Sequence, residues 1–260
     1  MSGAPTPAEI FERAAEEGER RLDQSLLELV STSFIAGYTI VFGIVALGVV
    51  RGLVEPQVGE VARVAGALAF ATGLVFLIVG RAELFNENFF DPVAKAVDEP
   101  GSWMLSPLLR LWTLTFVFNL VGGVLFALIV SVPGVLPSES VEVLRTVAEE
   151  TVHRGTVTTF VSAIVGGTLI TLLSFLLQAV ETVRGRITVT YIVGFLLPLG
   201  PFDHTIVTAL YVFFGILFGA PVGYGALLEI VVVATAGNLV GGLGLGSITH
   251  IAQAAGAEDV

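Results

Sequence analysis

An aspartate and a histidine lie in the middle of the most apolar stretch of this chain. Residues 187–219 are almost wholly apolar except at residues 200–205, where the sequence reads GPFDHT. A run of about twenty apolar residues spans the hydrocarbon core of a bilayer, so this break falls near mid-depth. Broken backbone and ionisable groups at that depth normally line a cavity or are packed in protein. The stretch therefore predicts half of a substrate path, with Asp203 and His204 on it.

The composition indicates an integral membrane protein and excludes several kinds of chemistry. Apolar residues make up 54% of the chain and charged residues 13%, with no cysteine and a net charge of −11. Disulfides and thiolate metal sites are thus impossible, and the acidity argues against a nucleic-acid partner. The three histidines lie far apart, and the sequence has no paired nucleophile and base and no phosphate-binding glycine loop. We therefore expect no metal, no cofactor and no enzymatic activity.

The apolar runs predict an all-α, polytopic membrane protein with six transmembrane helices. Residues 1–30 read as an N-terminal amphipathic helix on the cytoplasmic membrane surface, residues 31–254 as the channel domain, and residues 255–260 as a C-terminal tail. The expected spans cover residues 34–50, 65–97, 108–132, 157–179, 187–219 and 227–251. A polar turn is expected at residues 51–63 and an acidic loop outside the bilayer at residues 133–154.

The distribution of basic residues predicts the orientation in the membrane. If the N-terminus is cytoplasmic, seven arginines and lysines outside the bilayer fall on the cytoplasmic side and four on the other side. Cytoplasmic loops carry the excess of positive charge. We therefore expect a multi-pass protein of the plasma or inner membrane, with both termini in the cytoplasm.

A short repeat relates the two halves of the chain. The pentapeptide NLVGG begins at Asn119 in the third expected span and again at Asn238 in the sixth. The same offset of 119 residues carries His204 back to Phe85, inside the polar insertion of the second span. Halves with three spans each must be inverted relative to one another, and paired broken helices in an inverted repeat indicate a transport site. The alternative is that these glycines serve ordinary helix packing.

Three motifs carry a resemblance to a known family. They are Glu83-Leu84-Phe85 with Asn88 in the second span, Phe202-Asp203-His204 in the fifth, and Gly237-Asn238 followed by LVGG in the sixth. In order and spacing they resemble the motifs of the formate/nitrite transporter family, over essentially all six spans. The resemblance implies an aquaporin-like protomer with broken second and fifth helices. It also implies a homopentamer with one pore per subunit and passage of small monovalent weak-acid anions.

The resemblance also implies roles for individual residues. His204 matches the central pore histidine, and Asp203 stands where glutamate is usual. Asn86 replaces the loop threonine that faces the histidine. The apolar constriction is implied at Leu84, Phe85 and Phe202.

Four positions depart from the family pattern and mark a divergent branch. Arg81 and Glu87 replace glycines, and Thr171 and Thr208 stand in the pore where asparagine is usual.

The charges near the breaks are expected to serve structure. We predict that Arg81 pairs with Asp203 or Glu83 and fixes the two loops, because buried charges are normally paired. The alternative is that Arg81 attracts the anion directly. Asn119 and Asn238 are likewise expected to serve structure rather than to contact the substrate.

The residues at the break favour a channel or a proton-coupled carrier for weak acids such as formate, nitrite or acetate. Protonating an anion removes most of its desolvation cost, and histidine exchanges protons near neutral pH. Two alternatives remain: an aquaglyceroporin-like channel for neutral solutes, whose Asn-Pro-Ala signatures are missing, and a non-conducting membrane scaffold or sensor. The expected partners are the bilayer, a small anion, protons and further copies of the chain.

Overall fold

The computed structural model describes residues 4–99 and 101–258. In this part of the chain every regular element is a helix, and there is no β-strand. Four of its helical stretches are long and apolar enough to cross a membrane: Leu26–Val79, Leu105–Val130, Thr156–Ala179 and Tyr224–Ala257. The predicted all-α membrane fold is therefore confirmed.

The first of these stretches is a hairpin of two helices. Helix α2 (Leu26–Val58) starts at Ser25, whose side chain accepts the Glu28 N–H at 3.2 Å, and it ends at Gly59 with φ of 60°. A single turn, η1 (Gly59–Val61), leads into α3 (Ala62–Val79). The predicted polar turn at residues 51–63 is therefore mostly helix. Arg51 is kept in α2 by an ion pair at 3.3 Å with Glu55, one helical turn further on.

Both helices expected to be broken are broken. Between α3 and α4 (Asp91–Asp98) the chain leaves the helix and makes one short turn, η2 (Asn86–Asn88). Between α8 (Val183–Leu199) and α9 (Thr205–Leu217) the chain is extended at His204, with φ of −110° and ψ of 117°. Each break is thus a short non-helical segment inside an apolar stretch.

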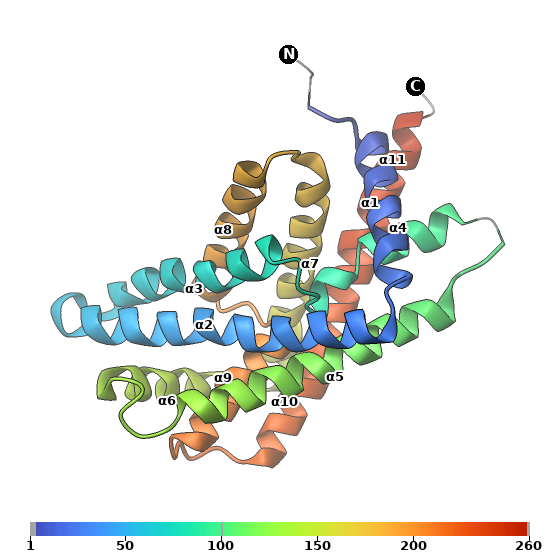
Figure 1. Ribbon diagram of the computed structural model, residues 1–260. Helices are drawn as coiled ribbons and strands as arrows, with labels where there is room; N and C mark the ends of the chain where they lie inside the picture. The colour runs from blue at the N-terminus through green and yellow to red at the C-terminus, as the bar shows by residue number, and fades with distance from the viewer. Residues whose placement is uncertain (1–3, 100, 259–260) are drawn as a thin grey trace.

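The remaining helices surround these breaks. They are α5 (Leu105–Val130), α6 (Ser138–His153), α7 (Thr156–Ala179), α10 (Tyr224–Leu239), a π-helical segment (Val240–Ser247) and α11 (Ile248–Glu258). The region predicted as an acidic outer loop is instead the helix α6, which packs on α9 and α2 (Figure 1). Helix α11 continues through much of the predicted tail, and residues 259 and 260 lie outside the described residues.

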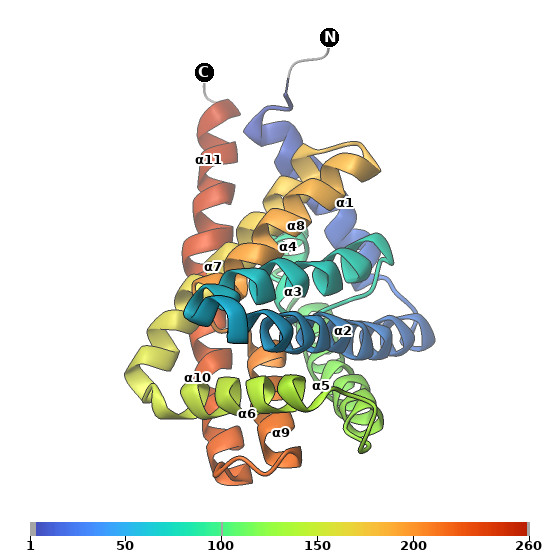
Figure 2. The same ribbon diagram turned by 90° about the vertical axis from the view of Figure 1, so that its left-hand side faces the viewer.

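The two ends of the described chain lie at the same end of the molecule (Figures 1 and 2). There α1 (Pro7–Leu22) packs against α4 and α11, and its buried residues include Ile10, Ala14 and Leu22. A capping box between Thr6 and Glu9 starts this helix. The apolar face expected to rest on the membrane surface is thus covered by protein.

The core is centred on the short helix α9. Every residue from Thr205 to Gly215 is buried, whereas α5 and α10 expose large apolar side chains such as Leu125 and Val232. A helix buried on all sides lies inside a bundle, and exposed apolar faces suit lipid or a neighbouring subunit. The fold therefore places the His204 end of α9 at the centre of the protein.

Candidate functional site

Two buried asparagines hold the two breaks with the same set of hydrogen bonds. Asn119 Nδ2 donates to the carbonyls of Ser33 at 2.8 Å and Glu83 at 2.9 Å, and its Oδ1 accepts the Phe85 N–H at 2.9 Å. It thereby ties the loop after α3 to α2 and α5. Buried backbone groups need partners, so a break at this depth requires such a residue.

Asn238 does the same at the second break. Its Nδ2 donates to the carbonyls of Ala163 and Asp203, both at 2.7 Å, and its Oδ1 accepts the Thr205 N–H at 2.8 Å. The same oxygen also accepts Thr205 Oγ1 and Asn86 Nδ2, both at 2.7 Å. The repeated pentapeptide therefore supplies one equivalent tie for each broken helix, and the second tie joins the two breaks.

His204 lies at the start of α9 and is buried. Its side chain is 1% exposed, and neither ring nitrogen has a hydrogen-bond partner in the part of the chain that the structure describes. The nearest charged group is Glu87 on η2, whose Oε2 lies 3.7 Å from Nε2. The residue expected to face the histidine, Asn86, gives its amide to Asn238 instead.

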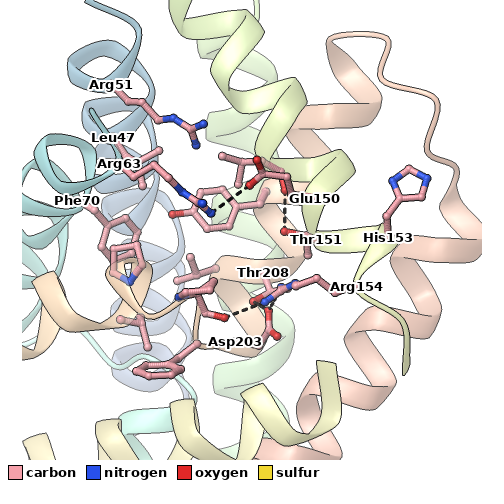
Figure 3. Close-up of a pocket in the computed structure, with 17 residues that line it drawn as sticks. Leu47, Arg51, Arg63, Phe70, Glu150, Thr151, His153, Arg154, Asp203 and Thr208 are labelled. Atoms are coloured by element: carbon pink, nitrogen blue, oxygen red, sulfur yellow. Dashed lines mark hydrogen bonds and ion pairs between the residues drawn. The ribbon is translucent and has the colours of Figure 1, made fainter. Parts of the chain in front are cut away.

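A cavity of about 370 Å³ lies beside the break between α8 and α9. Its walls come from α2, α3, α6, α8 and α9, and its charged lining residues are three arginines and two acids: Arg51, Arg63, Arg154, Glu150 and Asp203. Figure 3 shows the Arg63 side chain directed toward Glu150 and Arg154 directed toward Asp203. Each arginine of the lining is paired with an acid: Arg63 with Glu150, Arg154 with Asp203, and Arg51 with Glu55 of its own helix.

An ion pair between Arg154 and Asp203 lies in the cavity wall. Arg154 donates to Asp203 Oδ1 at 2.7 Å and to the Pro201 carbonyl at 2.8 Å, and Thr208 Oγ1 donates to the same aspartate oxygen at 3.1 Å. Phe202 also lines the cavity. Asp203 is the residue directly before His204, which is itself not among the cavity residues.

Two of the predicted constriction residues, Leu84 and Phe85, belong to the buried apolar core, and the third, Phe202, packs against it. Leu84 and Phe85 are buried at 0% and 4% exposure. The Phe85 ring packs edge-on against Phe89 and Phe116, with centroids 5.1 and 5.3 Å apart.

The predicted pairing of Arg81 is wrong. Arg81 is exposed, and it has no ion pair within 4.0 Å among the described residues. Asp203 is paired with Arg154, and Glu83 contacts Arg20 at 3.1 Å. Arg81 has φ of 53°, in the left-handed region that favours glycine, at the turn that ends α3 and begins the first break.

The two threonines predicted in the pore lie in different places. Thr208 lies in the cavity wall with Asp203 and Phe202. Thr171 is not among the cavity residues; its Oγ1 donates to the Gly242 carbonyl at 3.2 Å, and its methyl packs on Gly246.

Sequence reasoning missed the arginines of the cavity. Arg51, Arg63 and Arg154 are three of the four basic residues that are expected outside the bilayer on the side opposite the termini. The one available signal was that all three flank expected spans on the side opposite the termini.

A polytopic helical protein with two broken helices meeting at a buried histidine has the architecture of a membrane channel or transporter. The family model for the formate/nitrite transporter matches residues 8–252, and the chain therefore belongs to that family. It is a multi-pass membrane protein of a transporter and channel family.

Individual relatives and solved structures agree with this assignment. The "Probable formate transporter" of Methanothermobacter thermautotrophicus is 27% identical, covering 93% of this chain and 94% of its own length. The "Inner membrane protein YfdC" of Escherichia coli (strain K12) is 21% identical over 94% of this chain and 77% of its own length.

Two solved structures share the fold. An "FNT family ion channel" matches 93% of this chain and 97% of its own chain, with a TM-score of 0.81 and 17% identity. A "Pentameric formate channel with formate bound" matches 86% and 95%, with a TM-score of 0.74 and 19% identity.

Proposed function

We propose that this protein moves formate and similar small weak acids, such as nitrite and acetate, through a pore in each subunit. The path runs from the arginine-lined cavity past Phe202 to His204, with Leu84 and Phe85 as the constriction. The observation that carries this proposal is a buried imidazole whose ring nitrogens have no partner among the described residues, at the break whose residues 201–203 line the cavity.

The charges and dipoles of the path suit an anion. The guanidinium groups of Arg51, Arg63 and Arg154 offer hydrogen-bond donors in the cavity wall, and the N-terminal end of α9, whose residues Val207 and Thr208 also line the cavity, adds its positive dipole end. An apolar constriction at Leu84 and Phe85 would exclude bulk water, so a bare anion there loses most of its hydration.

The imidazole of His204 lowers that cost in two ways. It can donate a hydrogen bond to the anion, and it can exchange a proton with it near neutral pH. Protonation turns formate into neutral formic acid, which crosses an apolar constriction far more easily than the anion. Coupling to a proton gradient follows from this exchange.

Topology and assembly are part of the proposal. The termini lie at one end of the molecule, and the four outer arginines and seven cytoplasmic basic residues support a cytoplasmic location for that end. The pentameric state named for the formate channel of the same fold, together with exposed apolar residues such as Leu125, supports a homopentamer.

Reconstitution into proteoliposomes tests the function. Uptake of formate, nitrite, acetate, lactate and hydrosulfide is measured with and without a proton gradient, beside glycerol and empty liposomes. We expect uptake of the small acids well above empty liposomes and stimulation by an inward proton gradient. Uptake of glycerol alone would instead show a neutral-solute channel, and no uptake of any solute would show a non-conducting protein.

A further inference from the structure

The cavity beside the second break is far larger than the acid that the path is proposed to carry. Its volume is about 370 Å³, within the range of roughly 300–1,000 Å³ in which protein pockets hold organic molecules of many atoms. Formate is a single carboxylate and leaves most of this space to water. The cavity therefore has room for an acid that carries an apolar body beside its carboxylate.

Part of the cavity wall is apolar. It is built from residues of four helices that also belong to the buried core: Leu47, Phe70, Leu197 and Val207. The ring of Phe70 lies 6.5 Å from that of Tyr211, centroid to centroid, and Tyr211 also lines the cavity. Aromatic rings attract one another at such distances. A ring or a branched aliphatic group can therefore bury its surface on this wall.

Arginines supply groups that bind a carboxylate in the same cavity. Figure 3 shows Arg51 and Arg63 extending from the neighbouring helices α2 and α3 toward the same side. Arg63 meets Glu150 at 3.5 Å, and the two side chains are 49% and 46% exposed, so the cavity opens to solvent there. An exposed pair of this kind contributes little to stability, and a guanidinium has five N–H donors. Arg63 can therefore bind the carboxylate of a ligand.

The hydroxyl group of Tyr211 is a second sign of a ligand. Tyr211 lines the cavity and is 9% exposed, and its hydroxyl has no hydrogen-bond partner in the described part of the chain. A buried tyrosine hydroxyl normally has a partner. An acid bound in the cavity can accept this O–H and so supply the hydrogen bond that the protein itself does not provide.

The proposed path beyond the cavity is too tight for a large acid. It runs past Phe202 to Leu84 and Phe85, which pack in the buried apolar core. An acid with a ring would have to displace several of these side chains, and close-packed interiors resist such changes. A large acid therefore stays in the cavity.

We propose that the arginine-lined cavity is a binding site for monocarboxylic acids with an aromatic or branched apolar body, and that these acids block the path without crossing it. This inference rests on the proposed function and adds a class of ligand that the pore does not carry. The carboxylate binds at Arg63, and the Tyr211 hydroxyl donates to the ligand. The apolar body packs against Leu47 and Phe70.

The test uses benzoate as the probe, and benzamide, which has nearly the same shape without the charge, as its control. Binding of each to the full chain in nanodiscs is measured by isothermal titration calorimetry. Uptake of formate and of labelled benzoate is measured in strongly buffered proteoliposomes at equal pH on both sides, above empty liposomes. We expect benzoate to bind about tenfold more tightly than benzamide, because its hydrogen bonds are charge-assisted. Benzoate should inhibit formate uptake over the same concentration range and should not itself be taken up through the protein.

Four variants locate the site. Arg63→Gln should raise the dissociation constant of benzoate about tenfold, and Arg63→Lys, which keeps the charge, should raise it less. Tyr211→Phe removes only the hydroxyl and should raise the constant about fivefold. Arg145→Gln removes an arginine that pairs with Glu142 at 2.9 Å and is not among the cavity residues, and it should match the wild type. The oligomer size in detergent shows which variants have assembled, and either Arg63→Gln or Tyr211→Phe is sufficient for the test.

The outcomes distinguish the inference from the function beneath it. If benzoate does not bind, or binds the assembled cavity variants as tightly as the wild type, the inference is overturned, while formate uptake by the wild type leaves the proposed function standing. Uptake of benzoate through the protein would show that the acid crosses the path and would also overturn the inference. If the wild type takes up no small acid, the proposed function is overturned, and the block with it, even where benzoate binds.

Discussion

Replacing Asn238 by leucine tests whether the second break depends on a single side chain. Leucine has nearly the same shape and removes all five hydrogen bonds of the amide, to Ala163, Asp203, Thr205 and Asn86. Hydrogen bonds inside membrane proteins are worth about 0.6 kcal/mol each on average. Asn238→Leu should therefore lower the free energy of unfolding by roughly 3 kcal/mol, about a hundredfold in the equilibrium constant.

The matched variant is Asn119→Leu at the first break. Asn119 makes three such hydrogen bonds, so the expected loss is roughly 2 kcal/mol. Val232→Ala, on an exposed position of α10, is the control that should change stability little.

Unfolding in mixed detergent, monitored by circular dichroism, measures the three variants in parallel. Formate uptake by Asn238→Leu should fall with stability, because the Thr205 end of α9 loses its anchor. If Asn238→Leu were as stable as the wild type, or lost less stability than Asn119→Leu, the proposed role of Asn238 in holding the second break would be refuted.

Two further predictions concern ion pairs. Arg154→Gln should destabilise the protein by about 3–5 kcal/mol, because it leaves the charge of Asp203 buried and uncompensated. The double variant Arg154→Gln/Asp203→Asn should regain most of the lost stability, as measured by thermal unfolding. A double variant no more stable than the single one would contradict this. Burial raises the pKa of Glu17, but the Arg20 hydrogen bond and the charges of Arg21 and Arg20 outweigh it and lower the pKa from 4.5 to about 2. A lowered pKa contributes stability that is complete above about pH 4.5 and is lost as the pH falls toward 2. Hydrogen exchange of the α1 amides should therefore accelerate as the pH falls through that range. Glu17→Gln should make the exchange rate less dependent on pH.

The apolar helices and the two breaks could be predicted because they follow from local composition. Apolar runs of the right length give the helices, and the polar residues inside the second and fifth runs mark the breaks. The repeated pentapeptide identified Asn119 and Asn238, but only the structure shows that each amide satisfies the backbone of one break.

The partners of the charged residues could not be predicted. Arg154 lies 49 residues from Asp203 in the chain, and no sequence spacing indicates that α6 folds back onto α9. The pairing of Arg81 was predicted wrongly because the sequence position indicates a residue's depth in the membrane but not where its side chain points. The left-handed turn at Arg81 leaves this side chain exposed.

The replacement of a glycine by Glu87 was visible in the sequence, but its approach to His204 was not. The two residues are 117 positions apart on different breaks, and the side chain expected to face the histidine was that of the preceding residue. In a non-helical segment the turns decide which side chain faces which neighbour, and the spacing of residues in the sequence does not specify those turns.

The most direct test of the account is formate uptake by His204→Ala in proteoliposomes, compared with the wild type at equal protein density and with the same oligomer size in detergent. If His204 is the group that makes the constriction passable, uptake should fall to the level of empty liposomes. Full retention of uptake in a correctly assembled His204→Ala protein would remove the histidine from the mechanism.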